Sequence, residues 1–225
     1  MQRWELLDTG PVPDARGTME LFRRGTELAI RVDGRELMSS RMHGSEDALA
    51  DLACDRVGGR PRARLLVGGL GMGFTLAAAL ARVGPEARVV VAELVPCVVR
   101  WNRDQLAHVA GRPLDDPRAS VFEGDVGEAI RQAPAAWDAI LLDVDNGPKG
   151  LTRPSNDWLY GWHGLKAAHA ALRPGGILGV WSAAPDVAFT RRVARAGFDV
   201  EAVTVRARGK QGGRRHVVWI GVREG

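Results

Sequence analysis

A short apolar segment that ends in a cluster of glycines constrains this chain more than any other feature. Residues 64–75 read ArgLeuLeuValGlyGlyLeuGlyMetGlyPheThr, an apolar run that stops in glycines and restarts as a helical pattern. Glu93 ends a second apolar run twenty residues after Gly73. In a Rossmann-like sheet such glycines let the backbone turn tightly against a ligand, and a carboxylate at the tip of the next strand accepts hydrogen bonds from ribose hydroxyls. The pattern therefore predicts a nucleoside-binding site.

Composition limits the class of protein. The 225 residues, 45% hydrophobic and 26% charged, suit one globular α/β domain with a small appendage. The first residues lack a signal-peptide core, and no apolar run approaches the ~18 residues that span a bilayer, so we expect a cytoplasmic protein without membrane contact. The net charge of +4 is spread thinly along the chain, and we expect no nucleic-acid partner. Cys54 and Cys97 lie far apart and predict neither a metal site nor a disulfide.

The order of patterns predicts an N-terminal β unit followed by a doubly wound sheet. Two alternating runs over residues 18–38, with turn glycines, indicate a small antiparallel β-hairpin, and we assign residues 1–44 to this unit and 45–225 to a Rossmann-like domain. From residue 62 onward, strands and helices alternate. Strands are expected at 63–68, 88–93, 119–123, 138–144, 176–182, 198–206 and 215–222, and helices at 73–83, 95–109, 125–132, 160–172 and 186–196. A mainly parallel sheet with a terminal antiparallel hairpin matches the seven-stranded fold of class I methyltransferases.

Acidic residues follow three of the predicted strands. Ligands of open parallel sheets lie beyond the carboxyl ends of the strands, so these side chains are candidates for the site. Asp125 opens a helix, where it either caps the helix or meets the amine of an adenine. Asp143, Asp145 and Asn146 follow the run AlaIleLeuLeu and either form a turn or orient an amine and accept its proton.

The chain resembles the spermidine synthases, a family of polyamine aminopropyltransferases that joins a small N-terminal β unit to a methyltransferase-type sheet. The resemblance is carried by ValAspGly at 32–34, MetHisGlySerGlu at 42–46, the glycine loop at 67–73, AlaGluLeu at 92–94, the stretch 116–125 that ends in GlyAsp, and AspAlaIleLeuLeuAsp at 138–143. It implies that Glu93 binds the cofactor ribose, that Asp125 binds the adenine and that Asp143 deprotonates the attacking amine.

The complete set of expected site residues follows from the strand ends and this resemblance. We expect a cofactor site made by Gly69, Leu70, Gly71, Gly73, Glu93, Leu94, Asp125, Val126 and Asp143. Catalysis is assigned to Asp143 and Asp145, and acceptor binding to His43, Asn146, Trp158 and Tyr160. His43 could equally cap the helix that follows it.

Departures from the family divide the functional hypotheses. The resemblance places an acid of the family's glycine loop, which grips the amine of decarboxylated S-adenosylmethionine, near Gly71, and a glutamine at Leu37. We therefore expect first a methyltransferase that uses S-adenosylmethionine and a small-molecule acceptor, an amine being one choice. The alternatives are an aminopropyltransferase that uses the decarboxylated cofactor, and a nucleoside-binding protein without turnover. A homodimer is the assembly that such chains most often form.

Overall fold

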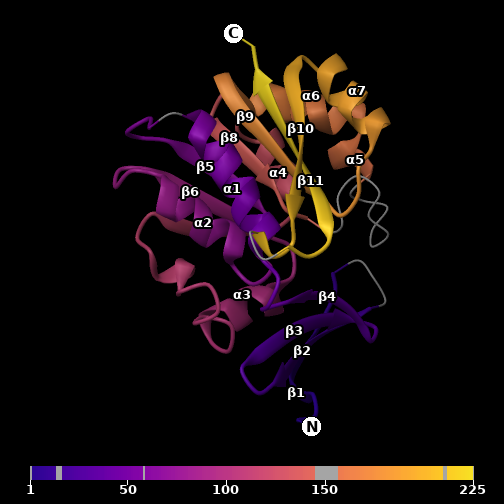
Figure 1. The fold of residues 1–225 in the computed structure, drawn as a ribbon. Helices are drawn as coiled ribbons and strands as arrows, with labels where there is room; N and C mark the ends of the chain where they lie inside the picture. The colour runs from indigo at the N-terminus through magenta and orange to yellow at the C-terminus, as the bar shows by residue number, and fades with distance from the viewer. Residues whose placement is uncertain (1, 14–16, 58, 145–156, 210–211, 225) are drawn as a thin grey trace.

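The computed structural model describes residues 2–13, 17–57, 59–144, 157–209 and 212–224. It contains a four-stranded sheet, in the order β1-β2-β3-β4, and a seven-stranded sheet, in the order β10-β11-β9-β8-β5-β6-β7. Figure 1 shows the small sheet at the N-terminal end of the molecule, below the larger domain. Within the described ranges, every helix is too short or too polar to cross a lipid bilayer.

The N-terminal sheet is larger than the predicted hairpin. Its strands are β1 (Glu5–Pro11), β2 (Thr18–Arg24), β3 (Glu27–Val32) and β4 (Arg35–Ser39), all paired antiparallel. Sequence patterns missed β1, because this edge strand ends in Gly10 and Pro11 and lacks a regular alternation of buried residues. Asp8 ties β1 to the larger domain, since its carboxylate accepts hydrogen bonds from Arg100 (2.7 Å) and from the indole of Trp101 (2.8 Å).

The seven-stranded sheet confirms the predicted fold class. Its strands are β5 (Arg64–Gly68), β6 (Arg88–Glu93), β7 (Ala119–Glu123), β8 (Trp137–Leu142), β9 (Leu172–Ser182), β10 (Phe198–Arg206) and β11 (Arg215–Arg223). The helices are α1 (Gly44–Val57), α2 (Phe74–Arg82), α3 (Pro96–Arg103), α4 (Val126–Arg131), α5 (Asp157–Tyr160), α6 (Trp162–Ala171) and α7 (Val187–Arg195), with a short 3₁₀ turn at Pro113–Asp115. Strands β5 to β9 pair in parallel, and β11 runs antiparallel to both β9 and β10.

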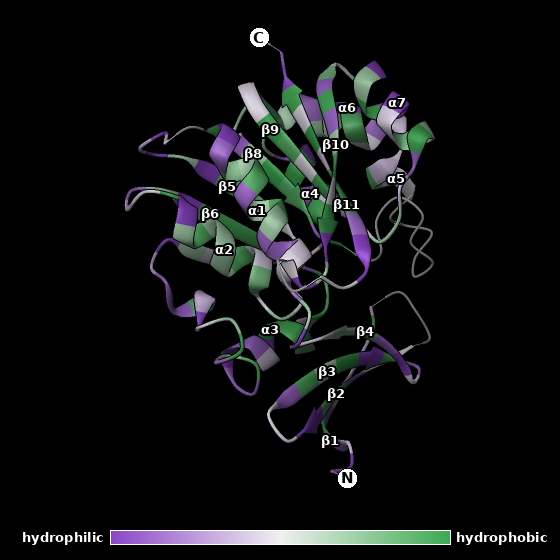
Figure 2. Cartoon of the chain, in the orientation of Figure 1, coloured by the Kyte–Doolittle hydropathy of each residue, from purple (hydrophilic) through white to green (hydrophobic). Residues whose placement is uncertain are grey.

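Helices cover both faces of this sheet, so its central strands are apolar on both sides. Leu65 and Val67 of β5 belong to one core cluster, with residues of α1, α2 and α3, whereas Leu66 between them belongs to a second cluster, with residues of α4 to α7. All three side chains are fully buried, as the two-residue period of a strand between two helical layers requires. Figure 2 shows the resulting hydrophobic band along the central strands. Cys54 and Cys97 are buried in the first of these layers.

Two predicted element ends were wrong. The segment Pro174–Gly176 lies inside β9, which begins at Leu172, because the pairing with β8 shifts register there and Gly175 takes a positive φ of 68°. Helix α3 ends at Arg103 and not at residue 109, since Asp104 leaves the helical region (φ −128°, ψ −99°). Both differences lie away from the ends of the strands that carry the predicted site.

Parallel register brings the candidate site together. Gly68 of β5 is paired with Ala92 of β6 on one side and with Leu142 of β8 on the other. The residues that follow these three positions are Gly69, Glu93 and Asp143, so they form one row at the carboxyl edge of the sheet. Hydrogen bonds from Gly69 N–H to the Ala92 carbonyl (2.9 Å) and from Asp143 N–H to the Gly68 carbonyl (2.8 Å) continue the pairing into that row.

A buried carboxylate holds the opposite end of the same strands. Asp138 is 2% exposed and accepts hydrogen bonds from Arg60 (2.6 Å), Arg173 (2.9 Å) and the backbone N–H of Arg64 (2.8 Å). Asp138→Ala leaves two guanidinium groups and one N–H without this partner. We expect it to lower the free energy of unfolding by about 2–4 kcal/mol in urea denaturation.

The matched control is Glu86→Ala, which removes an exposed ion pair with Arg62 (3.1 Å). Such surface pairs contribute about 0.5 kcal/mol or less. Equal effects of the two substitutions would show that Asp138 does not hold the sheet.

Candidate functional site

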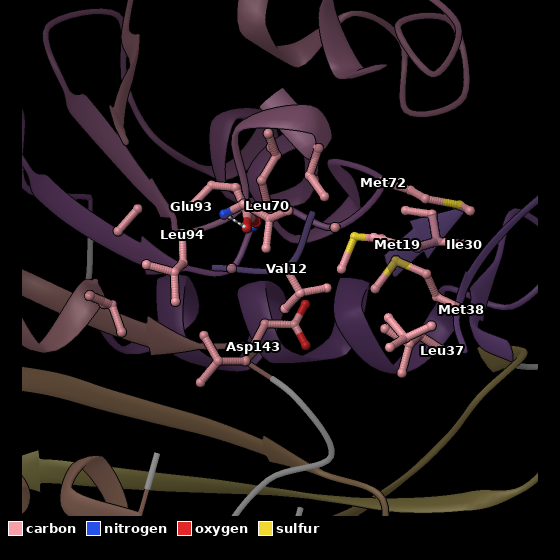
Figure 3. A pocket seen from close by; sticks show the side chains of 18 of the residues that line it. Val12, Met19, Ile30, Leu37, Met38, Leu70, Met72, Glu93, Leu94 and Asp143 are labelled. Carbon is pink, nitrogen blue, oxygen red and sulfur yellow. Dashed lines mark hydrogen bonds between the residues drawn. The ribbon is translucent and has the colours of Figure 1, made fainter. Parts of the chain in front are cut away.

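A cavity of about 430 Å³ lies between the N-terminal sheet and the carboxyl edge of the seven-stranded sheet. Its walls come from Val12, which follows β1, from β2 to β4, from the start of α1 and from the loops that follow β5, β6, β7 and β8. Eight of the predicted site residues line it: Gly69, Leu70, Gly71, Glu93, Leu94, Asp125, Val126 and Asp143. Figure 3 shows Glu93 and Leu70 on one side of this pocket and methionines on another.

The glycine loop has a backbone that only glycine adopts readily. Gly69 and Gly71 have φ values of 89° and 52°, in the left-handed region that penalises a Cβ atom. A Cβ on Gly69 would also overlap the carbonyl oxygen of Asp143. Glycine at this position therefore lets the loop lie directly against the end of β8.

A buried asparagine that the sequence analysis missed fixes the same loop. Asn102 on α3 is 2% exposed, and its amide donates hydrogen bonds to the carbonyls of Gly71 (2.8 Å) and Val98 (2.9 Å). Gly73 packs against this asparagine and begins α2 with a φ of 86°. It is not among the described lining residues and lies behind the loop, so its predicted cofactor contact stays a prediction.

Glu93 is a buried carboxylate held by backbone donors. It is 8% exposed and accepts hydrogen bonds from the N–H groups of Leu70 (2.9 Å) and Val95 (2.8 Å). Burial raises its pKa, and the backbone N–H groups oppose that rise. Each carboxylate oxygen can accept a second hydrogen bond, and the side chain lines the cavity, so Glu93 can receive hydroxyl groups of a ligand.

Asp143 emerges from β8 beside the glycine loop. Its carboxylate accepts a hydrogen bond from the Thr75 hydroxyl on α2, at 2.6 Å. Burial raises the pKa of Asp143 to about 6, against the opposing effect of the Thr75 hydrogen bond. A carboxylate with a pKa near neutrality, reached through a cavity, is suited to proton transfer.

A second carboxylate, Glu46, shares the cavity with Asp143. It lies in the first turn of α1, and the Ser45 hydroxyl donates a hydrogen bond to it at 2.5 Å. Burial, followed by the negative charge of Asp143, raises the pKa of Glu46 to about 7. Glu46 belongs to the family-like segment at 42–46 but was not predicted as a site residue. Its signal was an acid in the first turn of a helix, which ordinarily indicates only helix stabilisation.

Asp125 both caps a helix and lines the cavity. Its carboxylate accepts a hydrogen bond from the backbone N–H of Glu128 (3.2 Å), which confirms the capping interpretation for α4. It also borders the cavity beside Val126. This position is compatible with the predicted contact to an adenine, which stays a prediction. A capping carboxylate retains further acceptor positions.

Three of the residues predicted to bind the acceptor, His43, Trp158 and Tyr160, are not among the described residues that line the cavity. The His43 ring stacks on Phe74 (centroids 4.3 Å apart) and contacts Asp47 (2.7 Å), one layer behind the cavity wall. The His43 carbonyl accepts hydrogen bonds from the N–H groups of Glu46 and Asp47 in the first turn of α1. Trp158 packs under Arg131, 4.5 Å from the ring centroid. Tyr160 is buried and donates its hydroxyl to the Val144 carbonyl (3.0 Å), which anchors the backbone after Asp143. Asp145 and Asn146 lie outside the described residues.

The N-terminal sheet supplies an apolar wall of the cavity. Met19, Ile30, Leu37 and Met38 come from β2, β3 and β4 and line the cavity together. Figure 3 shows them gathered on one side of the pocket, across from Glu93 and Leu94. Gly71 approaches Met38 closely, since an added Cβ would lie 3.0 Å from its terminal carbon. The glycine loop and the N-terminal sheet therefore form one continuous wall.

The charged residues in the described lining of the cavity are all acidic. Among the described lining residues there are acids and no arginine, lysine or histidine. The acids are Asp33, Glu46, Glu93, Asp125 and Asp143. Carboxylates grouped in a concave, partly desolvated site favour a positively charged ligand.

Comparison with solved structures identifies the fold. A spermidine synthase in complex with the transition-state analogue AdoDATO superposes with a TM-score of 0.77 at 17% identity, over 97% of this chain and 72% of that chain. The spermidine synthase from Thermotoga maritima gives 0.78 at 18% identity, over the same shares. The chain has the spermidine synthase fold. A probable spermidine synthase from Corynebacterium glutamicum ATCC 13032 gives 0.64 at 17% identity, over 97% of this chain and 79% of that chain.

The likeness to the spermidine synthases is one of structure. No protein-family model and no curated protein sequence matches this chain. The superposition spans both the four-stranded and the seven-stranded sheet, because it covers 97% of the chain.

The glycine loop gives a direct test of the site's architecture. Gly69→Ala adds both left-handed strain and an overlap with Asp143. We expect it to lower the free energy of unfolding by about 2–5 kcal/mol. The matched control is Gly59→Ala, where φ is 64° but nothing lies within 4 Å of an added Cβ. Strain alone costs about 1 kcal/mol there. Urea denaturation of both variants measures this difference. Similar losses of the free energy of unfolding in the two variants would contradict the close approach of the glycine loop to the end of β8.

Proposed function

We propose that this protein is an aminopropyltransferase of the spermidine synthase type. It would transfer the aminopropyl group of decarboxylated S-adenosylmethionine to a small-molecule amine. The fold supports this proposal, and the carboxylate-lined cavity is the observation that carries it. A neighbour that holds AdoDATO is consistent with such a donor.

The charge of the donor decides between the two transfer reactions. Decarboxylated S-adenosylmethionine carries a sulfonium and an ammonium, whereas the intact cofactor adds a carboxylate. A carboxylate placed among Glu46, Asp143 and Asp125 would be repelled unless a cation or free N–H groups received it. The described lining contains no such cation. The sequence-based preference for methyl transfer is therefore replaced by its alternative.

That preference rested on the missing acid in the glycine loop. Leu70 and Met72 are indeed buried apolar residues at this point. The structure supports a different source for the negative charge, because Glu46 from α1 and Asp143 from β8 line the same cavity as the loop. Segments far apart in the sequence can thus supply the negative charge that the glycine loop lacks.

The residues present fit an adenosyl donor. Glu93 has free acceptor positions for ribose hydroxyls, Asp125 and Val126 border the space proposed for the adenine, and Gly69 and Gly71 leave the loop backbone open to close approach. When bound, the donor supplies a carbon attached to positively charged sulfur, and the sulfur leaves as a neutral thioether.

Asp143 is the proposed base. The amine nitrogen of the acceptor forms a bond to the carbon as the carbon–sulfur bond breaks, and the amine proton passes to the Asp143 carboxylate. Its raised pKa, about 6, matches a group that accepts a proton near neutral pH. Thr75 fixes one of its oxygens, so the other oxygen is available to the amine. The remaining acceleration comes from holding amine and donor in line.

Methyl transfer from intact S-adenosylmethionine is the second candidate. The apolar glycine loop favours it, because the loop has no acid that would repel the carboxylate of the intact donor. The same cavity would then bind a donor whose carboxylate is received by loop N–H groups.

Calorimetric titration distinguishes the candidates. We expect decarboxylated S-adenosylmethionine to bind at least about 10-fold more tightly than the intact cofactor, a difference of about 1.4 kcal/mol. Methylthioadenosine, which lacks the charged chain, is the control for the adenosyl half of the site. Tighter binding of the intact cofactor would contradict aminopropyl transfer, and no binding of any of the three would overturn the nucleoside site itself.

A further inference from the structure

The row of residues at the carboxyl edge of the sheet continues past Asp143 to a tryptophan. Leu142 of β8 is paired with Val180 of β9, so the residues that follow them, Asp143 and Trp181, are neighbours in that row. Trp181 is 8% exposed and lines the cavity. Strand β9 lies on the side of β8 away from β6. Asp143 therefore stands between the end of the cavity at Glu93 and the end at Trp181.

Apolar side chains line the side of the cavity opposite Glu93. Figure 3 shows the wall from the N-terminal sheet across from Glu93 and Leu94, with Asp143 between the two groups in this view. The wall belongs to the same core cluster as Trp181, and its members that line the cavity are Met19, Ile30, Val32, Leu37 and Met38. A ligand that extends past Asp143 toward this wall meets carbon and sulfur atoms.

The acids of the described lining can be assigned to the charges of the reaction. Glu93 and Asp125 are proposed above for the ribose and the adenine. Glu46 and Asp143 are then left for two ammonium groups, one at the end of the donor's aminopropyl chain and one on the acceptor. An acceptor with a second ammonium group needs a further carboxylate.

The remaining polar residues of the described lining are poor partners for that further charge. Asp33 is exposed on the turn between β3 and β4 and accepts the N–H of Thr18 at 3.2 Å, and an exposed carboxylate binds a cation weakly. Ser39 is the one hydroxyl-bearing residue among the described lining residues. Its hydroxyl donates to Glu27 (3.4 Å) and accepts from the N–H of Arg41 (3.3 Å).

We propose that the acceptor is a primary monoamine with an apolar chain, whose nitrogen meets Asp143 while its chain lies against Trp181 and the apolar wall of the N-terminal sheet. This inference deepens the proposed function and rests on it. A buried ammonium group without a partner is costly, so an amine that ends in a methyl group binds better than a diamine of equal length. The flexible side chains of Met19 and Met38 let the wall adapt to the chain.

The reaction balances with this acceptor. The bound ammonium gives one proton to Asp143, and the neutral nitrogen forms a bond to the donor carbon as the carbon–sulfur bond breaks. The electron pair of that bond stays on sulfur. The products are methylthioadenosine and the apolar amine enlarged by an aminopropyl group on its nitrogen.

The affinities of two amines of equal length test the inference without turnover. In n-hexylamine a methyl group replaces the second ammonium group of cadaverine. Both are titrated by calorimetry into the unmodified protein, saturated with the thioether analogue of the donor that keeps the aminopropyl chain, lacks the methyl group on sulfur and cannot react. We expect n-hexylamine to bind about 10-fold or more tightly than cadaverine.

A chain-length series measures the contact with the wall. We expect affinity to rise about 3- to 4-fold for each methylene group from n-butylamine to n-hexylamine, as burial of a methylene group predicts. Tighter binding of cadaverine, or equal affinities along the series, would overturn the inference.

An acid introduced into the wall should reverse the preference. Leu37 is partly buried on the edge strand β4, and Leu37→Glu places a carboxylate in the cavity. We expect the ratio of the two affinities to shift about 10-fold or more toward cadaverine. The matched control is Leu6→Glu, which adds the same charge to the same sheet at a residue that is 49% exposed and outside the described lining.

The control should leave the ratio unchanged. Binding of methylthioadenosine shows that each variant is folded, and the comparison in the unmodified protein stands without either variant. An unchanged ratio in a folded Leu37→Glu protein would contradict the position of the acceptor chain.

Turnover separates this inference from the proposed function. With decarboxylated S-adenosylmethionine, we expect n-hexylamine to be converted with a higher kcat/KM than cadaverine. Faster conversion of cadaverine would overturn the apolar acceptor and leave aminopropyl transfer in place. Tight binding of n-hexylamine without product from either amine would overturn aminopropyl transfer and leave the apolar binding site in place.

Discussion

The parallel pairing of β5 with β6 and β8 is the interaction on which the rest of the structure depends. It places Gly69, Glu93 and Asp143 in one row, although each ends a different βα unit of the chain. Two further hydrogen bonds extend the pairing past the strand ends, so the glycine loop and the Asp143 backbone are fixed to each other. The other walls of the cavity surround that row.

The acids around the cavity are held by uncharged partners. Glu93 is held by backbone N–H groups, Asp143 by Thr75 and Glu46 by Ser45, and none of these partners is a cation. These carboxylates have raised pKa values and gain when a positive ligand arrives. A cavity of this kind is costly as a structural element and suited to a cationic substrate.

Local patterns predicted the parts of the molecule that are set by local rules. The seven strands, the glycine loop and the row of Glu93 and Asp143 follow from periodicity and from the meeting of parallel strand ends. Glu46 and Asn102 could not be found in this way, because their positions at the cavity and the loop depend on how α1 and α3 pack.

The residues predicted to bind the acceptor show the same limit of local sequence patterns. Trp158 and Tyr160 were predicted to bind the acceptor as aromatic residues, but Trp158 packs against Arg131 and Tyr160 donates its hydroxyl to the Val144 carbonyl. The apolar wall comes instead from the N-terminal sheet, whose position over the cavity no local pattern encodes. Leu37, which the sequence analysis noted as a departure from the family, is part of that wall.

The central claim is that this cavity supports aminopropyl transfer, and the products of a single incubation test it most directly. The protein is mixed with decarboxylated S-adenosylmethionine and a panel of primary amines, and the mixture is analysed by mass spectrometry beside a parallel reaction with the intact cofactor. The account predicts methylthioadenosine and one amine enlarged by an aminopropyl group. Adenosylhomocysteine and a methylated acceptor from the intact cofactor would contradict it.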